Sequence, residues 1–109
     1  MPLYAVIGLD RPNSTSLRDQ ERAAHRDFSR AHVDITRIAG ALWDSDGNQC
    51  GTLKIFEAES ADQLRAIYAD EPFFKAGVYE SIHIIEWRIA YYDNAFPAIP
   101  YPPAPSSPT

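Results

Sequence analysis

Strand-like and helix-like stretches follow one another along this chain in an order that few folds can accommodate. Residues 3–9 form an apolar run that Pro12 and Asn13 break, which predicts a buried first strand. Residues 17–31 contain neither Gly nor Pro, and hydroxyl side chains at 14–16 offer N-caps before them, which predicts a helix. The apolar stripe expected to face a sheet is Leu17, Ala24, Phe28 and Ala31.

The second half of the chain repeats the alternation. Residues 35–43 and 52–56 have strand patterns on either side of a turn signal at 46–48, so a hairpin is expected over 34–58. Ser60-x-x-Gln63 is a capping-box pattern that predicts a second helix. Pro72 suits the first turn of a further short helix, which Gly77 ends. Residues 78–92 predict a long last strand.

The resulting order is strand, helix, strand, strand, helix, strand. It predicts an α+β, ferredoxin-like βαββαβ fold with a four-stranded antiparallel sheet. Two helices cover one face of such a sheet, and the other face needs a different cover. In a chain of 109 residues a second copy is the economical one, so we expect a homodimer formed through the sheet faces.

Proline marks the expected end of the domain. We predict one domain over residues 1–95 and a Pro-rich C-terminal arm over residues 96–109, because six prolines there block both helix and central-strand pairing. Composition alone favours a disordered tail. The alternative is an extended arm that Ile99 and Tyr101 anchor on a partner subunit or across the mouth of a cleft.

Charge and hydropathy exclude several classes of partner. The chain carries 10 basic against 15 acidic residues, for a net charge of −5, which gives it no electrostatic reason to bind nucleic acid or an anionic membrane. No apolar run approaches the roughly 20 residues that span a bilayer, and no basic segment precedes the first strand. We therefore expect a cytoplasmic protein without a secretory signal. Its single cysteine, Cys50, cannot form an internal disulfide.

The first predicted helix carries the most informative polar pattern. Arg18, Arg22, His25, Ser29 and His32 are separated by steps of four, three, four and three, so they share one helix face. Guanidinium groups can hold a carboxylate or a phenolate, and an imidazole suits proton transfer near neutral pH. Spacing alone favours the plainer interpretation, in which a polar helix face simply meets water.

Other chemical candidates are weaker. His25 and His32 lie about 10.5 Å apart along a helix, so they are unsuited to sharing one metal ion. The chain has no zinc-binding, nucleotide-binding or nucleophile-elbow motif, so neither a metal nor a cofactor is expected. His83 in the last strand is interpreted as a half-buried structural histidine. The side chains expected on its face are Tyr79, Ser81, Ile85 and Trp87.

Three stretches together resemble the YciI, or YCII-related, family. The first is the Arg18-x-x-x-Arg22-x-x-His25 helix, and the second is Gly51-Thr52-Leu53 leading into a strand. The third and most specific is residues 71–81, with Glu-Pro-Phe followed by Ala-Gly and a final strand. The resemblance extends over roughly residues 3–90 at the level of element order.

This resemblance implies a ferredoxin-like domain that dimerises as an α/β barrel, with a His–Asp site between helix and sheet. His25 matches the family histidine. The family usually has Asp before the Pro, where this chain has Glu71, with Asp70 one position earlier. Either carboxylate can orient the imidazole, although Glu is one methylene longer. The implied chemistry acts on small cyclic or aromatic substrates and includes dehalogenation of a chlorinated hydroxyquinol.

Three functions remain open on this basis. The first is a cofactor-independent lyase- or isomerase-type enzyme, with His25 as general base or acid and Asp70 or Glu71 orienting it. Its anionic substrate would undergo isomerisation, elimination or dehalogenation, held by Arg18, Arg22 and Ser29. The second is a non-catalytic ligand-binding or accessory domain, which needs no contact between histidine and carboxylate. The third is a monooxygenase with a deep apolar cavity.

Overall fold

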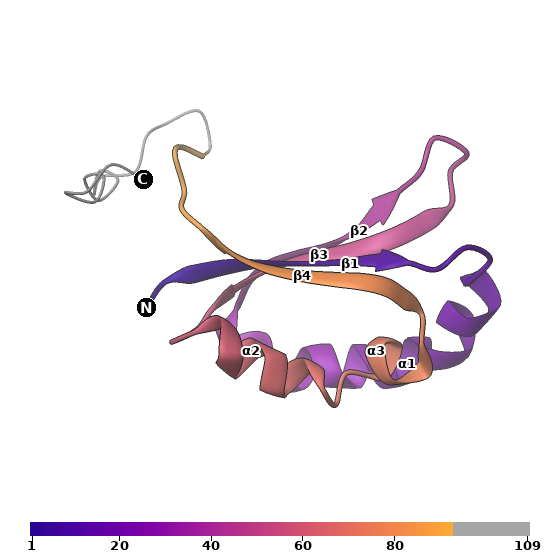
Figure 1. Ribbon diagram of the computed structural model, residues 1–109, viewed down its shortest axis with the longest axis horizontal. Coiled ribbons are helices and arrows are strands. Elements are labelled where there is room, and N and C mark those ends of the chain that lie inside the picture. Colours follow the sequence, from indigo (N-terminus) through magenta and orange to yellow (C-terminus); the bar gives the residue numbers. More distant parts are fainter. Residues whose placement is uncertain (93–109) are drawn as a thin grey trace.

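In the part of the chain that the structure describes, a four-stranded antiparallel sheet carries all of the helices on one face (Figure 1). The computed structural model describes residues 1–92. The strands lie in the order β2-β3-β1-β4, as the predicted ferredoxin-like α+β fold requires, so this prediction is confirmed. The elements in chain order are β1 (Leu3–Asp10), α1 (Thr15–Ala31), a 3-10 turn (Val33–Ile35), β2 (Thr36–Trp43), β3 (Gln49–Glu57), α2 (Ala61–Tyr68), α3 (Pro72–Ala76) and β4 (Tyr79–Trp87).

Strand pairing explains where the predicted boundaries were wrong. β3 begins three residues earlier than expected, because the hairpin continues until Trp43 pairs with Gln49. β4 ends at Trp87 and not at residue 92, because Trp87 pairs with Leu3 and β1 begins there. A strand without a neighbour loses its ladder of hydrogen bonds. The predicted Pro-rich arm, residues 96–109, lies outside the described residues.

The apolar core lies between the sheet and α2. Successive side chains of a strand point to opposite faces, so Val6 of β1 and Phe56 of β3 both point toward the helices. Leu64 and Tyr68 of α2 pack on them, and all four side chains are buried. Burying a side chain of this size stabilises a fold by about 1.5–3 kcal/mol.

The helix ends follow the sequence signals in two of three cases. The Ser60 hydroxyl accepts a hydrogen bond from the Gln63 N–H (3.1 Å), as the capping-box pattern predicts. Gly77 ends α3 with a φ of 81°, in the left-handed region that glycine tolerates. At α1 the prediction of a hydroxyl cap was wrong, because Ser14 Oγ donates to the Arg11 carbonyl (2.6 Å) and caps no helical N–H.

The buried face of α1 differs from the expected one. Ala24 and Ala31 of the predicted apolar stripe are exposed, whereas Arg18 is buried and His25 is half-buried. The interpretation in which the polar face of this helix meets water is therefore wrong. Arg18 is buried because Asp10, at the end of β1, provides a matching carboxylate beneath the helix.

The face of the sheet away from the helices is apolar, and none of the described helices covers it (Figure 1). Ala5 and Ile55 in its two central strands are buried. Ile38 and Ile85 lie on it with 59% and 56% of their surface exposed. His83 also lies there and is exposed, so the prediction of a half-buried histidine was wrong. Tyr79 does not share this face, because a register shift pairs it with Asp10 and turns its ring toward the helices. None of the described helices is long and apolar enough to cross a bilayer.

Candidate functional site

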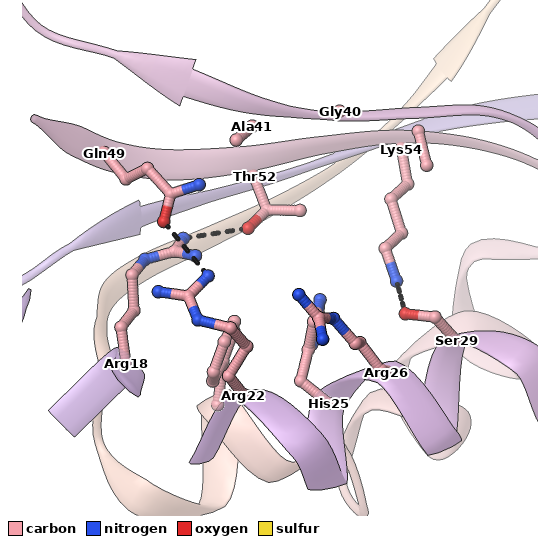
Figure 2. A pocket seen from close by; sticks show the side chains of 12 residues that line it. Arg18, Arg22, His25, Arg26, Ser29, Gly40, Ala41, Gln49, Thr52 and Lys54 are labelled. Carbon is pink, nitrogen blue, oxygen red and sulfur yellow. Dashed lines mark hydrogen bonds between the residues drawn. The ribbon is translucent and has the colours of Figure 1, made fainter. Parts of the chain in front are cut away.

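A cavity of about 460 Å³ lies between α1 and the β2–β3 side of the sheet (Figure 2). Its lining comes from α1 and, facing it, from β2, β3 and α3. Ala39, Gly40 and Ala41 of β2 line it, and most of the other lining side chains are polar. From α1 it receives Arg18, Arg22, His25, Arg26 and Ser29. From β3 it receives Gln49, Thr52 and Lys54, and Phe73 of α3 adds an aromatic wall. The helix face that the sequence singled out is thus the face that lines this cavity.

His25 is held on two sides. Its Nδ1 contacts Glu71 Oε1, and its ring stacks on Phe73 with centroids 4.0 Å apart and planes 9° apart. An ionised carboxylate only accepts hydrogen bonds, so against it Nδ1 carries the proton. The ring nitrogen left for a ligand is then Nε2, with its lone pair free to accept a proton.

Glu71 is the carboxylate that the structure brings to His25. It is fully buried, and its second oxygen, Oε2, accepts a hydrogen bond from the Phe74 N–H (2.7 Å) as the N-cap of α3. Pro72 occupies the first turn of α3, where its missing N–H costs nothing. Both carboxylate oxygens are therefore fixed, one by a helix end and one by the imidazole. Asp70 is exposed, and no ion pair joins it to His25 among residues 1–92.

Arg18 is already paired. Its Nε and Nη2 donate to the two oxygens of Asp10 at 2.5 and 3.1 Å, and Nη2 also donates to Thr52 Oγ1 at 3.0 Å. The guanidinium lies 4.7 Å from the centroid of the Phe73 ring. A bidentate pair of this kind is among the stronger ones in proteins. Arg18 therefore fixes the wall of the cavity, and its charge is matched before any ligand arrives.

The other guanidiniums lie nearer to solvent. Arg22 donates to Asp19 Oδ1 (2.6 Å) and, at 3.5 Å, to Gln49 Oε1 across the cavity, and its side chain is half-buried. Arg26 lines the cavity and is exposed. These two residues place positive charge at the rim, where an anionic ligand would enter.

Lys54 and Ser29 meet at one end of the cavity (Figure 2). Lys54 Nζ donates to Ser29 Oγ at 2.8 Å. Burial lowers the pKa of the Lys54 ammonium from its ordinary value, while the negative charge of Glu71 acts in the opposite direction. Beside them, the Tyr79 hydroxyl donates to Thr52 Oγ1 (3.1 Å), and burial raises the pKa of that phenol, so it stays neutral at physiological pH.

Sequence reasoning missed the contribution of β3. Thr52 and Lys54 alternate with Leu53 and Ile55, so they point to the same face as buried Phe56. A lysine at such a position is rarely buried in proteins, and this was the available signal. His32, the second histidine of α1, contacts the Phe28 carbonyl and does not line the cavity. Within residues 1–92 no group of three His, Cys, Asp or Glu side chains could hold a metal ion.

Comparison with known proteins identifies the family and the fold. The family model for the YCII-related domain matches residues 2–88. No curated protein matches the chain. Among solved structures, the chain is similar to the 5-chloro-2-hydroxyhydroquinone dehydrochlorinase (TftG) of Burkholderia phenoliruptrix AC1100 in complex with 2,5-dihydroxybenzoquinone. The match has 25% identity, covers 79% of this chain and 93% of that one, and has a TM-score of 0.74. Protein Atu4242 of Agrobacterium tumefaciens, at 11% identity, 84% and 96% coverage and a TM-score of 0.51, shares the fold.

Proposed function

This chain belongs to the family of YCII-related domains, and we propose that it is a small cofactor-independent enzyme that transfers protons on a hydroxylated ring substrate. The observation that carries this proposal is the contact between His25 Nδ1 and Glu71 Oε1 beside a cavity lined by cations. A histidine oriented in this way has the geometry of a general base, because the carboxylate fixes both its tautomer and the direction of its ring.

The charges around the cavity favour an anionic substrate. Arg22, Arg26 and Lys54 line it, whereas the carboxylate nearest to the imidazole, that of Glu71, is buried behind the His25 ring. A phenolate or enolate formed by proton transfer would be stabilised by these cations in its partly dehydrated position. Of the substrate-binding residues predicted from sequence, Arg22 and Ser29 keep this role in the proposal. Arg18 acts as a positioning residue, because Asp10 already neutralises it.

Elimination of a halide is the reaction that we favour, because the TftG neighbour is a dehydrochlorinase. On 5-chloro-2-hydroxyhydroquinone, His25 Nε2 would accept a proton from a ring hydroxyl, and the electron pair would move into the ring. The chlorine-bearing carbon then takes up a proton. Chloride leaves as a second hydroxyl loses its proton, so the net change is the loss of HCl and the product is a hydroxybenzoquinone. These steps balance without an oxidant or a metal.

The two other functions fit the site less well. A purely ligand-binding domain has no need of a carboxylate behind the imidazole, and this chain buries Glu71 completely to provide one. A cofactor-free monooxygenase needs a deep apolar cavity for a polycyclic substrate. The cavity here is lined by one histidine, one lysine and three arginines.

The proposal includes a second copy of the chain on the uncovered sheet face. Ile38, Ile85 and Trp87 are exposed there, and burying such side chains favours association. A two-fold axis brings the same patch of both copies together, so one apolar face serves both. Light scattering should give the mass of a dimer for the wild type and of a monomer for Ile85→Glu. A monomeric wild type would contradict this part of the proposal.

The test of the enzyme is chloride release from 5-chloro-2-hydroxyhydroquinone. His25→Ala should lower the rate by about a hundredfold to ten-thousandfold, the usual contribution of a positioned general base. His32→Ala removes a histidine from the same helix outside the cavity and should keep the wild-type rate. Wild-type turnover in His25→Ala would overturn the role of His25, and an inactive wild type would overturn dehydrochlorination as the reaction.

A further inference from the structure

Lys54 is a buried cation that lacks an acidic partner. Its side chain comes from the central strand β3, is 4% exposed, and is directed toward α1 at one end of the cavity (Figure 2). Its hydrogen bond goes to the neutral hydroxyl of Ser29. Within the part of the chain that the structure describes, no carboxylate forms an ion pair with its ammonium.

This arrangement opposes folding. Moving an ammonium out of water costs free energy unless a counter-charge or several hydrogen bonds replace the water. Arg18, the other buried cation of the site, has such a counter-charge in Asp10. Lys75, the second lysine of the chain, is exposed and avoids the cost. A cation that is kept in a buried position without a carboxylate is suited to receive an anion from outside the chain.

The Lys54 ammonium also has more N–H donors than there are acceptors bonded to it. A lysine ammonium has three N–H groups, and Ser29 Oγ accepts from one of them. The Phe56 ring lies 5.9 Å from Nζ, which is a weak cation–π contact at best. Two N–H groups therefore remain for water or for a ligand in the cavity.

Lys54 meets α1 on the side of His25 opposite to Arg22. Its partner Ser29 lies one helical turn beyond His25, about 6 Å along the axis, whereas Arg22 lies about 4.5 Å before His25. Figure 2 shows Arg22 and Gln49 on one side of His25, and Lys54 with Ser29 on the other. A ring held at both ends would lie across the Nε2 side of the imidazole.

We propose that Lys54 is a substrate-binding residue that holds an ionised oxygen of the ring at the Ser29 end of the cavity, while Arg22 holds a second oxygen at the opposite end. This inference rests on the proposed function and narrows its substrate class. The substrate is a six-membered ring with ionisable oxygens on opposite sides, and the bond that reacts lies between them, next to His25.

The test is calorimetric titration of 2,5-dihydroxybenzoquinone, a ring with two acidic hydroxyl groups on opposite sides that are ionised at neutral pH. The proteins are the wild type, Lys54→Met and Lys75→Met. Both substitutions remove one positive charge, so the net charge of the two variants is the same. Lys54→Met should raise the dissociation constant by about tenfold to a hundredfold, as expected for loss of a charge-assisted hydrogen bond. Lys75→Met should stay within about twofold, because its charge is solvated and screened.

A second ligand and a second variant keep the test decisive. Hydroquinone, which is neutral at pH 7, should bind wild type and Lys54→Met with similar affinity, since it brings no charge to the ammonium. Lys54→Gln keeps a donor for Ser29 without the charge and replaces Lys54→Met if that protein does not fold. Equal affinity of Lys54→Met and Lys75→Met for the quinone would overturn the role of Lys54 and leave the role of His25 intact. A wild type that does not bind the quinone would overturn the substrate class itself.

Discussion

The layer between helices and sheet has two unlike halves. Under α2, Val6, Phe56, Leu64 and Tyr68 fill the space with apolar side chains. Under α1, the same layer holds charged and polar groups around a cavity of about 460 Å³. One strand, β3, serves both halves, because Phe56 points into the first and Lys54, two residues away, into the second. Apolar packing and the polar cavity are therefore separated within one sheet face by two residues of β3.

This separation explains how a small domain tolerates buried charge. The apolar half supplies hydrophobic burial, and the polar half opposes it with a buried lysine and a buried carboxylate. Substitutions in the apolar half should therefore change mainly the free energy of unfolding. Substitutions in the polar half should change binding and turnover while leaving the fold nearly unaffected, or should even stabilise it.

The largest effect is expected in the apolar half. Phe56→Ala removes a side chain that is 1% exposed and should lower the free energy of unfolding by about 3–5 kcal/mol. Phe74→Ala is the matched control, because Phe74 is 48% exposed and its removal leaves no closed cavity. Urea unfolding followed by circular dichroism measures both. Equal losses for the two variants would contradict the contrast between a filled half and an open one.

A smaller loss of stability is expected at Gly8, which lies between the apolar and the polar half. The ring of Tyr79 lies against Gly8, and a Cβ at that position would meet ring atoms at 2.7–2.9 Å. Gly8→Ala should therefore lower the free energy of unfolding by about 1–3 kcal/mol, the usual cost of overpacking. Gly40→Ala adds the same methyl group where no heavy atom lies within 4 Å, and thermal unfolding should show a shift close to zero. If both variants melt at the wild-type temperature, the Tyr79 ring does not pack tightly against Gly8.

The smallest change in the free energy of unfolding is expected in the polar half, where substitution of Lys54 should increase stability and not reduce it. Burial lowers the pKa of Lys54 below 10.5, so the unfolded chain binds its proton more tightly than the folded chain. Wild-type stability is therefore reduced at pH 7, and this loss disappears as pH rises through the folded pKa toward 10.5. Lys54→Met should be at least as stable as wild type at pH 7, and its advantage should shrink toward pH 10.

The comparison of Lys54→Met with wild type cancels other titrations, including the buried tyrosines, whose pKa values burial raises. Urea midpoints at pH 7 and pH 9.5 give the result. A Lys54→Met protein that is less stable than wild type at pH 7, by the same amount at both pH values, would show that the ammonium stabilises the fold.

The order of elements was predictable because each element carries its own local signal. Ser60 and Gln63 mark the start of α2, and Gly77 marks the end of α3. The buried face of α1 was not predictable in this way. Nothing near Arg18 in sequence indicates that Asp10 will lie beneath it, since that contact depends on how β1 and α1 pack.

The site could be predicted in the same partial manner. Spacing placed Arg18, Arg22, His25 and Ser29 on one helix face, and the family resemblance singled out His25. Spacing could not decide between Asp70 and Glu71, because the choice depends on the turn that begins α3 and on the length of the glutamate side chain. Lys54 was missed because its role arises from the helix across the cavity, 25 residues earlier in the chain.

The most direct measurement is a crystal structure of the chain with 2,5-dihydroxybenzoquinone. The ring should lie in the cavity under α1, with one oxygen about 2.6–3.2 Å from His25 Nε2 and another in contact with Lys54 Nζ. The His25–Glu71 contact should persist in the complex. A ring bound on the uncovered sheet face, or in the cavity with His25 Nε2 turned away from it, would contradict the assignment of this cavity as the active site.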